Sequence, residues 1–208
     1  VRSCVEAMKN SAGKIPVTVK SRIGVDNQNP HEVLPEFIAK VANSGCNVFI
    51  IHARKALLEG LSPKDNRRVP PLQYPLVYEM QNKFPELDII LNGGLTDLEN
   101  IKSCLATPVA GVMIGREAYE NPSILLGVDK EIFDQKEHGG DMKDAIWNMI
   151  EYCHREQAEG TAIKGILKHL KGAFKGQANS KNFRRLLFCN QTVDSEKLKK
   201  LSSLVTNY

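Results

Sequence analysis

The chain has 208 residues, 42% of them hydrophobic and 25% charged, which are ordinary values for a globular protein of one or one and a half domains. No run of about 18 apolar residues is present, so the sequence predicts no membrane-spanning helix. The five cysteines are scattered without a CxxC pair or a Cys/His cluster, so we expect free thiols and no metal site. The first residues read as the interior of a helix without an initiator Met, and we therefore expect a preceding segment. We expect a cytoplasmic protein, or an organellar one if a targeting peptide precedes Val1.

The net charge of +4 is spread unevenly along the chain. Residues 142–208 carry 12 Lys and Arg against 6 Asp and Glu, whereas residues 1–141 carry 16 against 18. A basic region on a near-neutral body indicates a polyanionic partner. A solvated helical face would give the same count, and charge alone does not separate the two.

Short apolar runs alternate with amphipathic segments over the first 120 residues. We expect strands at 17–20, 48–51, 88–91 and 111–114, and helices at 3–12, 31–44 (capped by Gly45), 74–84 and 97–105. Strands that alternate with helices in this way predict a parallel α/β sheet. Because the runs are continuously apolar, we expect both faces of the sheet to be buried.

The pattern changes after residues 134–141 (DQKEHGGD), which read as a charged, glycine-containing linker. Only helical periodicity follows, at 142–159, 163–174, 182–188 and 196–205. The sequence therefore predicts an α/β domain over 1–133, a linker over 134–141 and a small all-helical domain over 142–208.

Each predicted strand ends in residues that can bind a ligand. In parallel α/β folds the functional residues lie at the carboxyl ends of the strands. These ends carry Lys20 and Arg22, then His52 and Arg54, then Asn92-Gly93-Gly94, and then Gly115-Arg116. The alternative for the second strand is that His52 only terminates a core segment.

The last two strand ends fit a phosphate clamp, in which glycines let backbone N–H groups approach and Arg116 supplies charge. The alternatives are a plain tight turn at Gly93-Gly94 and a surface ion pair at Arg116. Lys20 and His52 would suit the ring of a flavin. The spacing does not distinguish a flavin from another phosphorylated ligand.

Five segments taken in order resemble the tRNA-dihydrouridine synthases, and most of all the bacterial type that acts on uridines 20 and 20a of the D-loop. They are residues 17–24 (VTVKSRIG), 51–55 (IHARK), 60–67 (GLSPKDNR), 91–94 (LNGG) and 112–119 (VMIGREAY). Residues 169–172 and 183–185 extend the resemblance into the predicted helical region. The resemblance implies the second half of an FMN-binding (β/α)8 TIM barrel followed by a C-terminal helical tRNA-binding domain.

The resemblance also implies roles for individual residues. Lys20 and His52 would contact the flavin ring, while Asn92, Gly93, Gly94, Gly115 and Arg116 would hold the FMN side chain and phosphate. The tRNA contacts would come from Lys64, Arg67, Lys181 and Arg184. Lys181 stands where the family pattern has Arg, which keeps the charge but loses the planar fork.

The implied reaction is an NADPH-driven reduction of uridine to 5,6-dihydrouridine. NADPH reduces FMN, the reduced flavin gives hydride to C6 of a flipped uracil, and a Cys general acid protonates C5. The family's Cys lies in a Cys-Pro-Ser context that would precede Val1. We therefore expect no catalytic residue in this chain, no turnover by it alone, and a monomeric enzyme at full length.

Two other functions stay open from the sequence. The basic excess of 142–208 would also suit a tRNA-binding module without catalysis. Another flavin- or phosphate-binding barrel, similar to dihydroorotate dehydrogenases, would explain the strand ends. The segment Ser62–Arg67 and the basic region argue against that third function, because a small-molecule oxidoreductase needs neither.

Overall fold

The computed structural model describes residues 1–136, 140–189, 194–206 and 208. It divides into two compact units, Val1–Ile114 and Gly115–Tyr208, which are described separately. Residues 137–139 of the expected linker lie outside the described residues, and the expected domain limits at 133 and 142 stay a prediction. Within the described ranges, every helix is too short or too polar to span a membrane.

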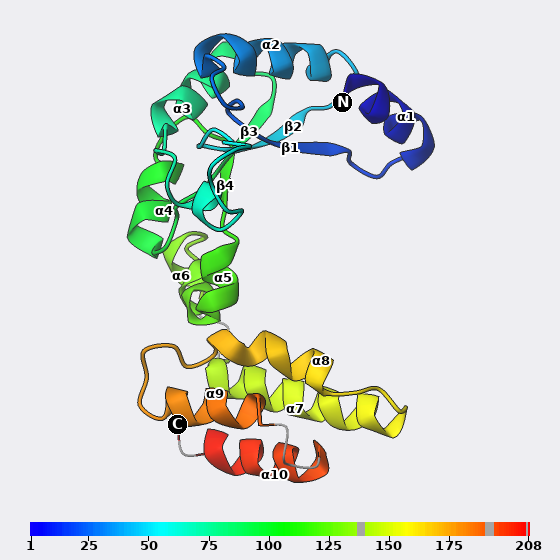
Figure 1. Cartoon of the computed structure of the whole chain (residues 1–208), viewed down its shortest axis with the longest axis vertical. Helices are drawn as coiled ribbons and strands as arrows, with labels where there is room; N and C mark the ends of the chain where they lie inside the picture. Colours follow the sequence, from blue (N-terminus) through cyan, green and yellow to red (C-terminus); the bar gives the residue numbers. More distant parts are fainter. Residues whose placement is uncertain (137–139, 190–193, 207) are drawn as a thin grey trace. The chain divides into compact units, whose positions relative to one another are not determined.

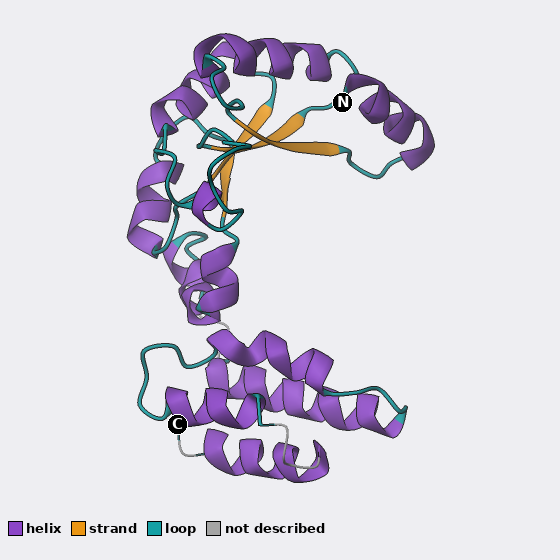
Figure 2. Ribbon diagram, in the orientation of Figure 1, coloured by secondary structure: helices purple, strands orange, loops and turns teal. Residues whose placement is uncertain are grey.

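The first unit is built on a four-stranded parallel sheet (Figure 2). The strands lie in sequence order and are β1 (Thr18–Arg22), β2 (Val48–His52), β3 (Asp88–Asn92) and β4 (Gly111–Met113). The prediction of a parallel α/β sheet is confirmed, with each strand within two residues of its expected limits. The parallel order means that all four carboxyl ends meet at one edge.

Helices alternate with these strands and lie along the outer side of the sheet (Figure 1). They are α1 (Arg2–Ala12), α2 (Pro30–Ala42), α3 (Tyr74–Lys83) and α4 (Leu98–Leu105). The side chain of Asp97 caps α4 by accepting from the backbone N–H of Asn100. Helix α2 ends with Asn43 as its C-cap. Gly45, with φ +85°, was expected to be the cap but lies two residues beyond it.

The two faces of the sheet are buried unequally. Phe49, Ile51, Ile89 and Leu91 are fully buried on the face that the helices cover. The residues between them on β2, such as Ile50, are only half-buried. The expectation that both faces are buried is wrong for the described residues, because their helices cover one face only.

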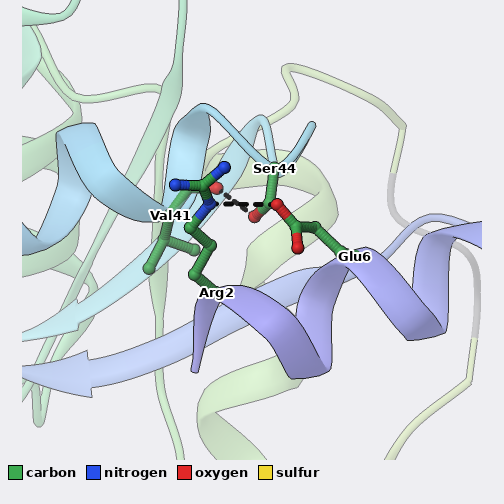
Figure 3. Close-up of polar contacts among 4 residues, drawn as sticks. All are labelled: Arg2, Glu6, Val41 and Ser44. Atoms are coloured by element: carbon green, nitrogen blue, oxygen red, sulfur yellow. Dashed lines mark hydrogen bonds and ion pairs between the residues drawn. The ribbon is translucent and has the colours of Figure 1, made fainter.

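Helix α1 contacts α2 and carries an ion pair of its own. Figure 3 shows the ion pair between Arg2 Nε and Glu6 Oε1 at 2.9 Å, beside the end of α2. Both side chains are exposed, so this pair contributes about 0.3–0.5 kcal/mol. In the same view the Ser44 hydroxyl donates to the Val41 carbonyl at 2.5 Å, which ends α2 before β2 begins.

Every regular element described in the second unit is helical. These elements are α5 (Arg116–Glu120), the 3₁₀ helix η2 (Pro122–Gly127), α6 (Val128–Glu131), α7 (Met142–Ala158), α8 (Lys164–Leu167), the 3₁₀ helix η3 (Lys168–Gly172), α9 (Ser180–Leu187) and α10 (Asp194–Val205). The short helices α5, η2 and α6 were not expected from the sequence. A capping box between Asp141 and Asp144 starts α7.

The single helix expected over 163–174 is instead the pair α8 and η3. The helical run ends at Gly172, Ala173 is extended with ψ 142°, and Phe174 takes a positive φ of +59°. This conformation turns the Phe174 ring into the core, 5.1 Å from the Phe183 ring and stacked 3.8 Å from Tyr208. Burial of the aromatic ring therefore outweighs continuation of the helix. The core around it consists of Met142, Ile146, Ile150, Cys153, Ile163, Leu167, Leu170, Phe183, Leu187, Leu198, Leu201 and Val205.

Gly172 allows η3 to touch the backbone of α5. A Cβ atom on Gly172 would lie 2.5 Å from the Tyr119 carbonyl oxygen and 2.7 Å from the Glu120 carbonyl carbon. We predict that Gly172→Ala destabilises the protein by about 1–3 kcal/mol, because backbone atoms cannot move aside cheaply. Thermal unfolding of the chain measures the effect.

Gly165→Ala in α8 is the matched control, since nothing lies within 4 Å of an added Cβ there. It should leave stability unchanged or raise it by up to about 1 kcal/mol. Equal unfolding temperatures for the two variants would contradict the close contact.

Candidate functional site

A single row of residues crosses the sheet at its carboxyl edge. The strand register pairs Arg22 with His52, His52 with Asn92, and Asn92 with Met113. These side chains all belong to the face that the helices leave uncovered. Lys20 lies on the same face, two residues before Arg22, opposite Ile50. The structure thus brings together three of the predicted ligand-binding side chains: Lys20, His52 and Asn92.

Asn92 fastens the ends of three strands to one another. Its side-chain Nδ2 donates to the Met113 carbonyl at the end of β4, at 2.7 Å. Its own carbonyl accepts from the Ala53 backbone N–H just after β2, at 2.9 Å. The residue is 9% exposed, so both bonds are protected from water. Asn92 therefore has a structural role in addition to its predicted contact with a ligand.

The two glycines after Asn92 form a turn that only glycine tolerates. Gly93 and Gly94 have φ of +110° and +75°. A Cβ atom on Gly93 would lie 3.1 Å from Nε2 of His52, so the histidine ring lies directly over this turn. The Tyr74 hydroxyl donates to the Gly93 carbonyl at 2.5 Å and fixes the turn from the helix side. The tight-turn and ligand-contact interpretations of Gly93-Gly94 are therefore compatible.

Positive charge is concentrated along this edge. Burial, and then the nearby charge of Arg22, lower the pKa of Lys20. The pKa of Arg22 is lowered by burial first, and then by the charges of Arg54 and Arg67. Four cationic groups thus lie within electrostatic range of their neighbours. Such a group of like charges favours an anionic ligand, which would relieve the repulsion.

The segment after β2 is tied to this edge by Arg22. Its Nη1 donates to the Lys55 carbonyl at 2.6 Å and to the Asn66 carbonyl at 2.8 Å. Lys64 and Arg67 are exposed on the single 3₁₀ turn η1 (Asp65–Arg67), for which Lys64 is the N-cap. The two predicted tRNA contacts of the first unit are therefore neighbours on one short turn.

The other predicted site residues belong to the second unit. Gly115 is the N-cap of α5 and Arg116 is its first residue. Nothing lies within 4 Å of a Cβ built on Gly115. Lys181 and Arg184 lie less than one turn apart on α9, and Lys181 is exposed. The clamp that would join Gly115 and Arg116 to Gly93-Gly94 stays a prediction.

Sequence reasoning did not place Asn66 or Tyr74 among the functional residues. Tyr74 reads as the start of a helix, and no pattern reveals that its hydroxyl reaches Gly93. Asn66 lies within residues 60–67, where the family resemblance implies roles only for Lys64 and Arg67. A clue was available, because Asn is a residue whose side chain commonly bonds to backbone groups in turns.

The fold and this edge define a parallel α/β protein with a cation-rich candidate site at the carboxyl ends of its strands. A family model described as "Dihydrouridine synthase (Dus)" matches residues 1–207. The chain therefore belongs to the dihydrouridine synthase family, and the family resemblance stated from the sequence is confirmed.

Three relatives illustrate the similarity, and each is named tRNA-dihydrouridine(20/20a) synthase. The Escherichia coli (strain K12) protein is 47% identical over 188 residues, covering 90% of this chain and 54% of that protein. The Vibrio cholerae protein is 46% identical over 186 residues, covering 89% and 56%. The Pasteurella multocida protein is 43% identical over 187 residues, covering 90% and 57%. The chain thus spans about half the length of the curated relatives it matches.

A solved structure of the Salmonella typhimurium RcsB response regulator covers 90% of this chain and 98% of its own chain. It is 14% identical with a TM-score of 0.29, which is too low to support any argument about fold or function.

The role of Asn92 in joining the strand ends can be tested by stability. We predict that Asn92→Ala lowers the free energy of unfolding by about 1–3 kcal/mol, because the Met113 carbonyl loses its donor in a buried place. Denaturant unfolding of the chain gives the value. The exposed Asn47, which precedes β2, supplies the control variant Asn47→Ala, expected within about 0.5 kcal/mol of the parent. A harmless Asn92→Ala would show that the link between the strand ends is dispensable.

Proposed function

We propose that this chain supplies FMN-binding and tRNA-binding parts of a tRNA-dihydrouridine synthase that reduces uridine to 5,6-dihydrouridine at positions 20 and 20a of the D-loop. The observation that carries the proposal is the row Arg22–His52–Asn92, with the Gly93-Gly94 turn directly beneath the His52 ring. Membership of the dihydrouridine synthase family supports the reaction class. The names of the relatives support the choice of uridines.

The architecture we propose is the second half of a (β/α)8 barrel. Four parallel strands in sequence order with helices on one face are what half of such a barrel contains. The half-exposed face that bears Lys20, Ile50 and His52 would then point toward the barrel interior. We further propose that residues 142–208 act as the helical tRNA-binding domain.

The residues present fit FMN. Gly93 and Gly94, with positive φ values, form a turn whose backbone a ligand can approach closely. The open space beside Gly115 leaves a second backbone segment accessible to a ligand. In this proposal Asn92, Gly93, Gly94, Gly115 and Arg116 hold the ribityl chain and phosphate. The guanidinium of Arg116 can pair with two phosphate oxygens at once.

The chemistry that a bound flavin supplies is hydride transfer, first from NADPH and then to the uracil ring. Lys20 and His52 would orient the ring and face its electron-rich side. Burial, and then the charge of Arg22, lower the pKa of Lys20, and a neighbouring negative charge would oppose that shift by favouring the ammonium form. Cys46 and Cys104 are buried and Cys4 lies on α1, so no cysteine described in the first unit is placed to protonate a substrate at this edge.

The proposed tRNA contacts are Lys64 and Arg67 on η1, and Lys181 and Arg184 on α9. Residues 160–193 contain seven Lys and Arg without a single Asp or Glu. An excess of cationic side chains without acidic ones favours contact with phosphates. The same observation supports the second candidate function, a tRNA-binding module without catalysis.

The phosphate clamp predicts that Arg116→Ala weakens FMN binding. Loss of one charge-assisted pair should raise the dissociation constant about 10- to 100-fold. The flavin absorption that stays with the chain after gel filtration measures retention directly. Arg185→Ala, which removes an exposed arginine of α9, should retain flavin like the parent. Equal retention in the two variants would refute the clamp.

The tRNA proposal predicts that Lys64→Ala and Arg184→Ala each weaken tRNA binding while FMN is retained. Each should reduce the slope of log affinity against log salt by about one, because one phosphate contact is lost. Fluorescence anisotropy with labelled tRNA at several salt concentrations gives the slopes. Lys83→Ala, at an exposed lysine of α3, is the control. If either variant lost flavin instead, the assignment of residues to the two ligands would be wrong.

A further inference from the structure

The segment that carries Lys64 and Arg67 has little hydrophobic anchorage. It runs from Leu57 to Pro71 between β2 and α3, and its only regular element is η1. Leu58 and Val69 are 71% and 61% exposed. Apolar burial therefore contributes little to holding this segment in one conformation. Its shape must depend on polar contacts, since each fixed residue costs about 1–2 kcal/mol of backbone entropy.

The side chain of Asn66 makes several of these contacts, beside the bond from the Leu58 N–H to Asp26 Oδ1 at 2.7 Å and the bond from Arg54 to the Pro70 carbonyl. Its Oδ1 accepts from the Leu57 backbone N–H at 2.9 Å, and its Nδ2 donates to the Leu57 carbonyl. Both polar groups of Leu57 are thus paired with one amide side chain across nine residues of chain. The Asn66 carbonyl also accepts from Arg22 Nη1 at 2.8 Å. Asn66 therefore closes the segment into a loop and joins it to the end of β1.

The local turn is fixed by a second set of bonds. The Ser62 hydroxyl donates to Asp65 Oδ2 at 2.6 Å, and the Asp65 N–H donates to Ser62 Oγ at 3.1 Å. The Asn66 N–H donates to the Ser62 carbonyl at 2.9 Å. With Asn66 directed inward in this turn, Lys64 and Arg67 on either side of it are exposed.

We propose that Asn66 is a positioning residue for tRNA binding: by bonding to Leu57 and, with Arg22, to the end of β1, it holds Lys64 and Arg67 in the orientation that phosphates require. The inference rests on the proposed function. In this proposal Asn66 does not contact tRNA. It affects tRNA affinity only through the positions of Lys64 and Arg67. Asn66 is thereby a determinant of affinity that carries no charge itself.

The first test follows the loop without any ligand. Hydrogen exchange on the full chain should show faster exchange at the Leu57 amide in Asn66→Ala than in the parent. Asn66→Asp keeps the Oδ1 acceptor for the Leu57 N–H but places a second carboxylate oxygen against the Leu57 carbonyl, so it should restore only part of the protection. Asn82→Ala, at an exposed asparagine of α3, is the matched control. Unchanged exchange at Leu57 in Asn66→Ala would overturn the proposal whatever the tRNA result.

The second test couples Asn66 to Lys64. We expect Lys64→Ala to weaken tRNA binding about five- to tenfold near 0.1 M salt, the share of one phosphate contact. In the Asn66→Ala background, Lys64→Ala should weaken tRNA binding less than twofold, because a lysine that is not held in position contributes little to the affinity. Fluorescence anisotropy with labelled tRNA, at several salt concentrations, measures the effect of Lys64→Ala in each background. If Asn66 served stability alone, the effects of the two substitutions on tRNA affinity would be independent.

The outcomes separate the two proposals. A parent chain that does not bind tRNA refutes the proposed function, and the positioning role falls with it, while the exchange data still decide the Leu57 bonds. A parent chain that binds tRNA, with effects of Lys64→Ala that are equal in both backgrounds, leaves the proposed function intact and overturns the role of Asn66.

Discussion

The hydrogen bonds of Asn92 hold the carboxyl edge of the sheet together, and the candidate site depends on them. The Asn92 side chain joins β3 to the end of β4, and its backbone carbonyl accepts from the residue after β2. The turn that follows brings Gly93 beneath the His52 ring. The parallel register then places Arg22 in the same row. A one-residue slip of β2 or β3 would turn His52 or Asn92 toward the helices, so the register itself selects which side chains can meet a ligand.

The sequence predicted the parts of this protein that follow from periodicity, and failed where tertiary contacts decide. Apolar runs of four residues between amphipathic segments were sufficient to locate the four strands and to place His52 and Asn92 at their ends. The helix over 163–174 was predicted from spacing, but the spacing cannot show that the helical run ends at Gly172 and that the Phe174 ring stacks on Tyr208 and meets Phe183 edge to face. Asn66 was missed for the same reason, since its partner Leu57 lies nine residues away and its other neighbour, Arg22, forty-four.

At this edge Arg22 takes part both in the repulsion among cations and in holding the loop that carries Lys64. Arg22 is close enough to Arg54 and Arg67 for their charges to lower its pKa, which is an unfavourable arrangement without an anion. Hydrogen bonds from the Arg22 guanidinium to the Lys55 and Asn66 carbonyls offset part of that cost. One side chain thus stabilises the loop that carries Lys64 while keeping positive charge beside His52. A polyanion that approached this edge would relieve the repulsion and tighten the same bonds.

The close approach of Gly172 to the backbone of Tyr119 and Glu120 links α5 to η3 without the help of side chains. Arg116 stands at the first position of α5, so an anion gripped by this arginine would be held by the unit that also contains α9. By mass action such a ligand would raise the apparent melting temperature of that helical unit as well as occupying a binding site. If the proposed contacts hold, a small phosphorylated ligand would thereby stabilise the unit that carries the proposed tRNA-binding helix α9.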